Sequence, residues 1–232
     1  MSFLLLLRIP TPASVSKRSP SPSFDELFAV VRLAHKYGIV NVERQGLEAV
    51  QEIYGSDVST CFDPSSSDDS RFVGYAIGAV NLARLTNTPS ILPVAMLRCA
   101  CLGGSVTDGW RRDDGSVEQL SLEDLKRVVN GREALARRGT FELLNLFSHI
   151  PARYCCVVDL CRETLSVIMG SLASQPCLGS ANIFEVHRST VDRLLKQSWC
   201  HDCAGFIRGY GLGRQKQMWD ALPEMFDLKI RD

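Results

Sequence analysis

The cysteines of this chain carry its clearest chemical pattern, because five of the nine fall in two short segments. The segment 199–203, WCHDC, contains a Cys-x2-Cys pair, and such a pair supplies two thiolate ligands to a zinc ion. Tetrahedral zinc needs two further ligands, and the upstream candidates are Cys156 and Cys161, with Cys155 as the substitute for Cys156. The two pairs lie just before and just after a predicted helical block, 162–197. The sequence therefore predicts a closed, structural zinc site formed by Cys156, Cys161, Cys200 and Cys203.

Two other interpretations of the same cysteines stand beside the zinc site. A W-C-x-x-C segment also occurs in thioredoxin-like redox proteins, where the first cysteine begins a helix directly after a strand. The segment before Trp199 is predicted to be helical, which disfavours this interpretation. Free cysteines also pack in protein cores as small apolar side chains, with no metal. Within the zinc interpretation, His201 offers a replacement for one thiolate.

The remaining residues that could do chemistry do not assemble into a recognisable catalytic pattern. Cys99 and Cys101 fall in an apolar helical segment, which favours core packing. The chain has no G-x-S-x-G nucleophile elbow. The glycines of the GYGLG run at 209–213 lack a preceding strand and a following Lys-Ser/Thr, so they predict a weakened or broken helix rather than a phosphate loop. We therefore expect a non-enzymatic protein with no evident small-molecule substrate and no cofactor beyond the zinc.

The composition narrows the kinds of partner. Lys and Arg together number 26, as do Asp and Glu, so the net charge is zero. Binding to nucleic acid or to an anionic membrane surface normally requires an excess of positive charge, so neither is expected. No apolar run approaches the length of a membrane span, and residues 3–7 are too short for a signal peptide. We therefore expect an intracellular protein, in the cytoplasm or nucleus, with reduced cysteines.

The spacing of apolar residues predicts a mainly α-helical fold with one small hairpin. Asp114-Gly115 is a hairpin turn signal within 107–120. Ser121 opens a helix that Gly131 is expected to kink or interrupt. The other helices are expected at 23–55 (two helices), 72–85, 91–102, 159–172, 184–197 and 215–226.

The first helix pair has the best-defined ends. Ser23 and Glu26 form a capping-box pattern, and Gly38 suits the residue after a helix, where positive φ is common. An apolar face of the first helix either packs on the core at 72–102 or binds a partner. Its residues are Phe24, Leu27, Phe28 and Val31.

The run SFDELFAVVRLAHKYGIVNV at 23–42 resembles the C-terminal helix pair of a BTB/POZ domain. With the later segments AVNLARLTNTPSILPVAMLRC, DGWRRDDGSVEQLSLEDLKRVVNGR, SWCHDC and QMWDALPEMFDL, the chain is similar to fungal BTB domain-containing proteins of basidiomycete type. The resemblance covers most of residues 23–228 and implies protein–protein interaction, by self-association or adaptor contacts. Most of the BTB core has no counterpart here, so the resemblance does not carry BTB dimerisation or a cullin adaptor role.

The domain organisation expected from these features has four parts. Residues 1–22 form an N-terminal segment and a Pro/Ser-rich linker, and 23–55 form the BTB-like helix pair. Residues 56–71 form a polar loop. Residues 72–232 form an α-helical extension with the hairpin near 107–120 and the cysteine cluster within 155–203.

Overall fold

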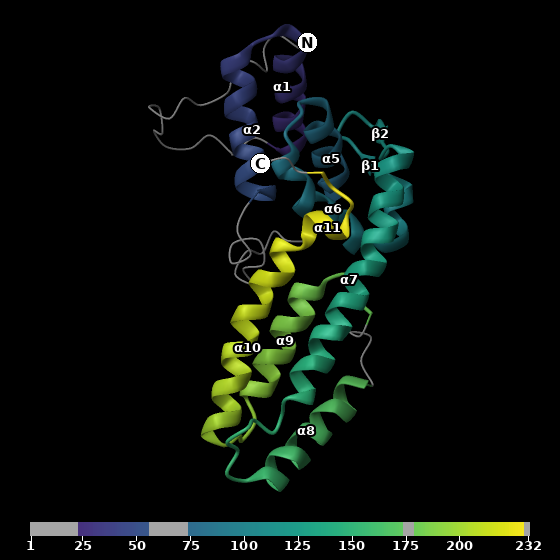
Figure 1. Ribbon diagram of the computed structural model, residues 1–232. Coiled ribbons are helices and arrows are strands. Elements are labelled where there is room, and N and C mark those ends of the chain that lie inside the picture. Colours follow the sequence, from purple (N-terminus) through teal and green to yellow (C-terminus); the bar gives the residue numbers. More distant parts are fainter. Residues whose placement is uncertain (1–22, 56–73, 174–178, 230–232) are drawn as a thin grey trace. The chain divides into compact units, whose positions relative to one another are not determined.

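The structure, a computed structural model, describes residues 23–55, 74–173 and 179–229 (Figure 1). The described residues are mainly helical with one small hairpin, which confirms the expected fold class. None of their helices combines the length and the apolar character needed to cross a membrane. The expected linker at 1–22 and the polar loop at 56–71 lie outside the described residues.

The elements occur in the following order. The α-helices are α1 (Phe24–Tyr37), α2 (Val40–Tyr54), α5 (Ala76–Leu85), α6 (Leu92–Cys101), α7 (Leu122–Ser148), α8 (Val158–Ala173), α9 (Ile183–Leu195), α10 (His201–Asp220) and α11 (Leu222–Met225). Two 3-10 helices, η1 (Pro89–Ile91) and η2 (Gly103–Asp108), flank α6. The strands β1 (Trp110–Arg111) and β2 (Val117–Glu118) pair antiparallel.

The chain divides into two compact units. Among the described residues, 23–55 and 74–125 belong to the first unit, and 126–173 and 179–229 belong to the second. The division therefore falls inside α7, within the part that the sequence assigned to the α-helical extension. The helix pair α1–α2 lies in the same unit as α5 and α6 because the four helices share a core.

The ends of α1 match its sequence signals. Ser23 Oγ accepts a hydrogen bond from the Glu26 backbone N–H at 3.2 Å, and the Glu26 carboxylate accepts one from the Ser23 N–H at 3.0 Å. This reciprocal pair satisfies N–H groups that have no partner within the helix. Gly38 ends α1 with φ 66°, a conformation that side chains with a Cβ adopt at a cost. The chain then turns directly into α2.

The apolar face of α1 packs inside the first unit. Phe28 and Val31 are fully buried, and Phe24 stacks on Tyr75 with ring centroids 4.8 Å apart. Phe28 also meets Trp110 edge to face at 5.7 Å. Leu27 is only partly buried. Of the two roles considered for this face, packing on the core is the one that the structure shows.

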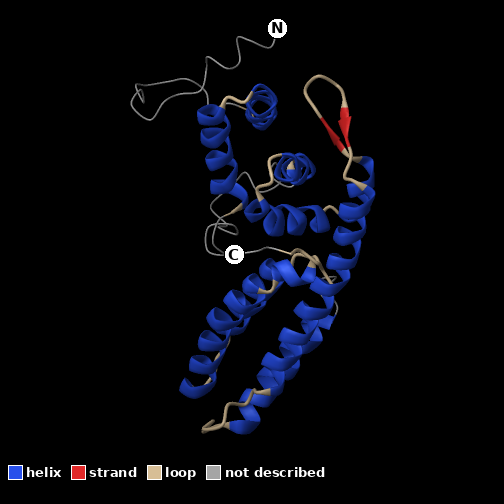
Figure 2. Ribbon diagram, turned by 45° about the horizontal axis from the view of Figure 1, so that its top comes forward, coloured by secondary structure: helices blue, strands red, loops and turns tan. Residues whose placement is uncertain are grey.

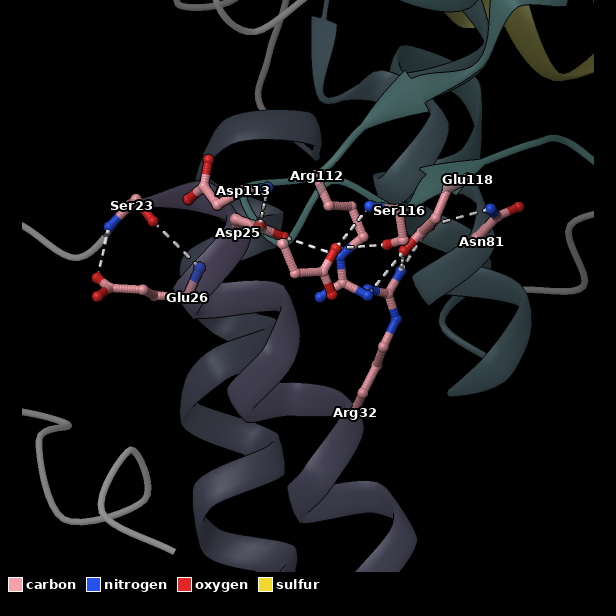
Figure 3. A network of polar contacts seen from close by, with 10 residues as sticks. Ser23, Asp25, Glu26, Arg32, Asn81, Arg112, Asp113, Ser116 and Glu118 are labelled. Carbon is pink, nitrogen blue, oxygen red and sulfur yellow. Dashed lines mark hydrogen bonds and ion pairs between the residues drawn. The ribbon is translucent and has the colours of Figure 1, made fainter. Parts of the chain in front are cut away.

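A polar network ties the hairpin to α1 (Figure 3). The buried Asp25 carboxylate accepts hydrogen bonds from Arg112 Nε at 3.0 Å and from the Asp113 backbone N–H at 2.7 Å. Glu118, on β2, forms an ion pair with Arg32, in which Glu118 Oε1 lies 2.8 Å from Arg32 Nη2. Two strands of two residues each bury little apolar surface. The hairpin is therefore held chiefly by these charged contacts and by the burial of Trp110.

The second unit is a helical bundle (Figure 2). One apolar cluster joins its four long helices. The buried members are Leu143, Leu146 and Phe147 of α7 with the following Ile150, Leu165, Ile168 and Leu172 of α8, Leu194 of α9, and Ile207 of α10. Both groups of cysteines singled out in the sequence lie at the beginnings of helices in this bundle, α8 and α10.

Glycine does not interrupt the bundle helices, contrary to expectation. The helix α7 continues through Gly131, and α10 runs from His201 to Asp220 through the glycines at 209–213. Gly131 lies where a Cβ atom would come within 2.2 Å of the Phe226 ring, so its lack of a side chain makes room for that ring. Packing of the bundle outweighs the intrinsic cost of glycine, which is about 1 kcal/mol per residue relative to alanine.

Candidate metal centre

Four cysteine side chains converge at one end of the bundle. The Sγ atoms of Cys155, Cys161, Cys200 and Cys203 all lie within 4.8 Å of one another. Among the described residues this is the one group of three or more His, Cys, Asp or Glu side chains within reach of a shared metal ion. Two of these cysteines come from the start of α8 and two from the start of α10, so the group joins segments that are distant in sequence.

The α8 half of the centre is built by a turn and the first helical turns. The Cys155 backbone N–H donates to the Ala152 carbonyl at 2.9 Å, which closes a turn and positions Cys155 before the helix. Cys161 follows in α8, where its N–H donates to the Val157 carbonyl at 3.1 Å. Its side chain is fully buried. One ligand position is therefore set by a turn and the other by the helix.

The α10 half uses the helix N-terminus. Cys200 is the N-cap of α10 with extended backbone angles, φ −65° and ψ 164°. Its sulfur lies 3.5 Å from the Cys203 backbone nitrogen, which donates to it. An N-cap side chain and the side chain three residues later can lie on the same side of the first turn. The Cys-x2-Cys spacing thus brings both sulfurs of the pair to the end of α10.

Trp199 anchors the chain between α9 and α10. Its indole N–H donates to the Leu194 carbonyl at 2.6 Å, one of the carbonyl groups that the end of α9 leaves without a partner within the helix. The Trp199 ring is partly buried against the bundle core. This contact fixes the approach of the chain to Cys200.

Backbone N–H groups point at the sulfurs. The Ala152 N–H donates to Cys203 Sγ at 3.3 Å, and the Cys203 N–H donates to Cys200 Sγ at 3.5 Å. Hydrogen bonds of this kind stabilise a thiolate over a thiol. Four thiolates around one divalent cation leave a net charge of −2, which such donors offset. The local backbone therefore suits sulfur in its anionic, metal-binding form.

The thiols of this group differ in the direction of their pKa shifts. The Cys203 N–H, together with neighbouring thiols, lowers the pKa of Cys200 to about 6. Burial raises the pKa of Cys203 and that of Cys155. The Cys155 and Cys200 Sγ atoms are 3.6 Å apart. A thiolate at Cys200 therefore lies among thiols that stay protonated, and a divalent cation bound there would favour the thiolate form of all four.

The spacing of the sulfurs fits a single tetrahedral ion. Zn–S bonds of about 2.3 Å place the sulfurs of a regular tetrahedron about 3.8 Å apart. The observed limit of 4.8 Å is compatible with this value after small side-chain adjustments. In an iron–sulfur cluster the cysteines bind different irons, so at least some of their sulfurs lie much farther apart. The geometry therefore favours a mononuclear centre with four thiolate ligands.

Three of the four ligands predicted from the sequence are in this group: Cys161, Cys200 and Cys203. The fourth member is Cys155, which the sequence offered as the substitute for Cys156. Cys155 occupies the position, and Cys156 is exposed to solvent. Adjacent side chains in a turn point in different directions, so only one residue of a Cys-Cys pair can face the other sulfurs here. The choice depends on the turn, and nothing in the residue types reveals it.

The structure also bears on the other roles that the sequence offered for the cysteines and for His201. His201 is exposed and is not a member of the group. Cys200 does begin a helix, as thioredoxin-like chemistry requires, but α9 precedes it where a strand would be needed. Cys99 is fully buried in α6, and burial raises its pKa, which suits a packing role.

Comparison with known proteins adds no relative. No family model, no curated protein and no solved structure matches this chain. The metal centre therefore rests on its own geometry.

Proposed function

We propose that this protein is a zinc-stabilised helical module in which one Zn²⁺ ion links the start of α8 to the start of α10. The observation that supports this most directly is the convergence of the sulfurs of Cys155, Cys161, Cys200 and Cys203 within 4.8 Å. Four protein ligands fill a tetrahedral coordination shell and leave no position for water or substrate. The role proposed for the ion is therefore structural and not catalytic.

The ion would stabilise a part of the bundle that has few buried side chains of its own. The segment between α7 and α8 is a turn with few buried residues, and Cys156 and Tyr154 in it are exposed. A metal bound to Cys155 and Cys161 would fix this segment against the α10 N-terminus. Because an unfolded chain does not offer a preformed site, the free energy of metal binding would contribute to folding of the bundle.

Zinc analysis of purified protein tests the proposal. Protein prepared with zinc under reducing conditions is expected to hold close to one equivalent after gel filtration, measured by elemental analysis. Cys203→Ser should reduce the content strongly, because Cys203 is a fully buried member of the group. Cys156→Ser and Cys101→Ser should leave it unchanged. Zinc content far below one equivalent in the wild type, or equal contents in Cys203→Ser and Cys156→Ser, would contradict the proposal.

Protein–protein interaction is the second candidate function, and an exposed apolar surface in the second unit supports it. Leu160 and Val167, two turns apart on α8, are 55% and 70% exposed. Phe141 and Leu144, one turn apart on α7, are 57% and 59% exposed. Large exposed apolar side chains at helical spacing are a common feature of interaction surfaces. The resemblance of the Ser23–Tyr54 pair to BTB proteins is consistent with this role, although the α1 face itself is packed.

Self-association is the simplest form of such an interaction to test. Light scattering during gel filtration, over a range of concentrations, reports the mass in solution. The double variant Leu160→Lys/Val167→Lys should lower that mass if α8 mediates self-association. An unchanged mass at every concentration would leave α8 with no part in self-association.

A further inference from the structure

Two of the four clustered cysteines differ from the other two in position and exposure. The Sγ atoms of Cys155 and Cys200 lie 3.6 Å apart, in a group whose sulfurs all lie within 4.8 Å of one another. Both side chains are partly exposed, whereas those of Cys161 and Cys203 are buried. Cys155 precedes α8 and Cys200 is the N-cap of α10, whereas the two buried cysteines lie inside these helices. Cys155 and Cys200 are therefore a close pair that solvent reaches and that no helical backbone holds rigidly.

We propose that a peroxide oxidises Cys155 and Cys200 to a disulfide, and that this bond releases the zinc while it keeps the start of α8 joined to the start of α10. The inference rests on the zinc centre proposed above and gives that centre a regulation. The oxidant would be hydrogen peroxide or an organic hydroperoxide. The reduced centre would hold the two segments through a metal, and the oxidised centre would hold them through a covalent bond.

The movement that this bond requires is small. A disulfide has an S–S length of about 2.05 Å, so the two sulfurs must come about 1.5 Å closer than they are. Cys155 lies in a turn that is closed by its hydrogen bond to the Ala152 carbonyl at 2.9 Å. The neighbouring side chains of Tyr154 and Cys156 are exposed. The turn can therefore shift towards Cys200 without displacing those two side chains from a core.

The chemistry balances in two steps. In the first step the Cys200 thiolate attacks one peroxide oxygen, the O–O bond breaks, and the other oxygen leaves with a proton from solvent as water or alcohol. Cys200 is then a sulfenic acid. In the second step the Cys155 thiolate attacks the Cys200 sulfur, the S–O bond breaks, and the departing hydroxide takes a proton to form water. One peroxide and two protons are consumed, and two thiolates are oxidised to one disulfide.

The disulfide removes two ligands from the metal at once. Its sulfurs carry no negative charge, so only the thiolates of Cys161 and Cys203 remain. A structural zinc site needs four protein ligands, and two are too few to retain the ion. The new bond joins the same two segments that the metal joined, because Cys155 and Cys200 come from different halves of the centre. Oxidation and chelation therefore both remove zinc, but only chelation should separate the segments.

Peroxide treatment of the zinc-loaded full-length protein tests the inference. The zinc content is measured first, after the reductant has been removed. Hydrogen peroxide is then added, released zinc is followed with a colorimetric chelator, and disulfides are mapped by mass spectrometry without reduction. The wild type should release about one equivalent of zinc as the Cys155–Cys200 linkage forms. A thiol reductant with fresh zinc should restore the content.

A control variant and a second measurement sharpen the test. Cys156→Ser is the matched control, because Cys156 is adjacent to Cys155 but lies outside the group. It should release zinc at the wild-type rate and give the same linkage. Hydrogen exchange then compares the two zinc-free states of the wild type. Segments 152–161 and 200–207 should exchange several-fold more slowly after peroxide than after treatment with a chelator and a thiol reductant.

The outcomes separate this inference from the function it rests on. Absence of zinc before peroxide overturns the zinc centre and this inference with it. Zinc that is bound at the start but is released without the Cys155–Cys200 linkage, or with another pair linked first, overturns the inference alone. Retention of zinc under conditions that oxidise the exposed Cys156 also overturns it. Equal exchange in the two zinc-free states would show that the disulfide does not take over the link between α8 and α10.

Discussion

A carboxylate that is fully buried lies in the C-terminal third of α7. Glu142 Oε2 is 3.0 Å from the Tyr210 hydroxyl, and its Oε1 is 2.8 Å from Arg138 Nε, close enough for an ion pair although not aligned for a hydrogen bond. Asn145 Nδ2 donates to the Tyr210 hydroxyl at 2.8 Å. Burial and the Glu142 carboxylate raise the pKa of Tyr210. The phenol therefore stays protonated and serves as a hydrogen-bond donor to the carboxylate.

Tyr210→Phe should destabilise the bundle by about 1 to 3 kcal/mol, because it leaves the buried carboxylate short of a donor and Asn145 short of an acceptor. Urea unfolding at neutral pH measures the change. Tyr154→Phe is the matched control, since the Tyr154 side chain is 72% exposed, and it should have little effect. Equal stability of Tyr210→Phe and wild type would show that the phenol hydroxyl does not support Glu142.

A second buried polar side chain makes stability depend on pH. His187 is 2% exposed, and neither ring nitrogen has a hydrogen-bond partner among the described residues. Burial lowers the pKa of His187 below its ordinary value of 6.5, and the nearby charge of Glu142 opposes this only in part. The unfolded chain therefore binds a proton at this histidine more readily than the folded chain does. Stability should be full above about pH 6.5 and should fall as the pH drops below it.

The contribution of His187 is measured by comparing variants at each pH. Wild type should lose up to about 1.4 kcal/mol per pH unit more than His187→Gln below pH 6.5. If the proposed zinc is released by acid, both proteins lose it equally, so that effect cancels in the comparison. His201→Gln, at an exposed position, should keep the wild-type slope. Parallel pH profiles for wild type and His187→Gln would rule out His187 as the source.

At the scale of the helices, glycine has two opposite roles. A Cβ at Gly131 of α7 would lie 2.2 Å from the Phe226 ring, whereas a Cβ at Gly209 of α10 would meet nothing within 4 Å. Gly131→Ala should therefore destabilise the second unit by about 1 to 3 kcal/mol through overpacking. Gly209→Ala should stabilise it by about 0.5 to 1 kcal/mol through lower backbone entropy in the unfolded chain. Thermal unfolding of the two variants with wild type gives the signs, and a stabilising Gly131→Ala would mean that Phe226 moves freely.

The helix and turn ends show which features of the elements the sequence can reveal. Local signals were sufficient where the interaction itself is local: the Ser23 capping box, the end of α1 at Gly38, and the turn at Asp114-Gly115, where Gly115 has φ 83°. Gly131 leaves room for the ring of Phe226, a residue that is distant in sequence. No local pattern encodes that contact, so intrinsic propensity gave the wrong expectation.

The metal centre follows the same division between local and distant information. The spacing of Cys200 and Cys203 is local, and it indicated a metal-binding pair directly. The convergence with the α8 cysteines depends on how the bundle packs, which the sequence suggested only through the positions of the pairs around block 162–197. The choice of Cys155 over Cys156 depends on one turn, closed by the hydrogen bond from Cys155 to Ala152. Residue types alone decided neither the convergence of the two cysteine pairs nor the choice between Cys155 and Cys156.

At the scale of the whole molecule, the two compact units should respond differently to metal. All four proposed ligands, Cys155, Cys161, Cys200 and Cys203, belong to the second unit. A ligand stabilises the state that binds it, by mass action. Removing zinc should therefore weaken the second unit first, beginning at the segments that the metal joins.

Hydrogen exchange measured by mass spectrometry tests this difference within one sample. With a zinc chelator and a thiol reductant, amide protection should fall at 152–161 and 200–207. It should stay unchanged in α5 and α6, whose core residues have no part in the centre. Cys203→Ser should show the same pattern without chelator, and the chelator should add little to it.

Equal loss of protection in both units would mean that they unfold as one cooperative system, and unchanged protection at 152–161 would mean that the metal does not hold α8 to α10.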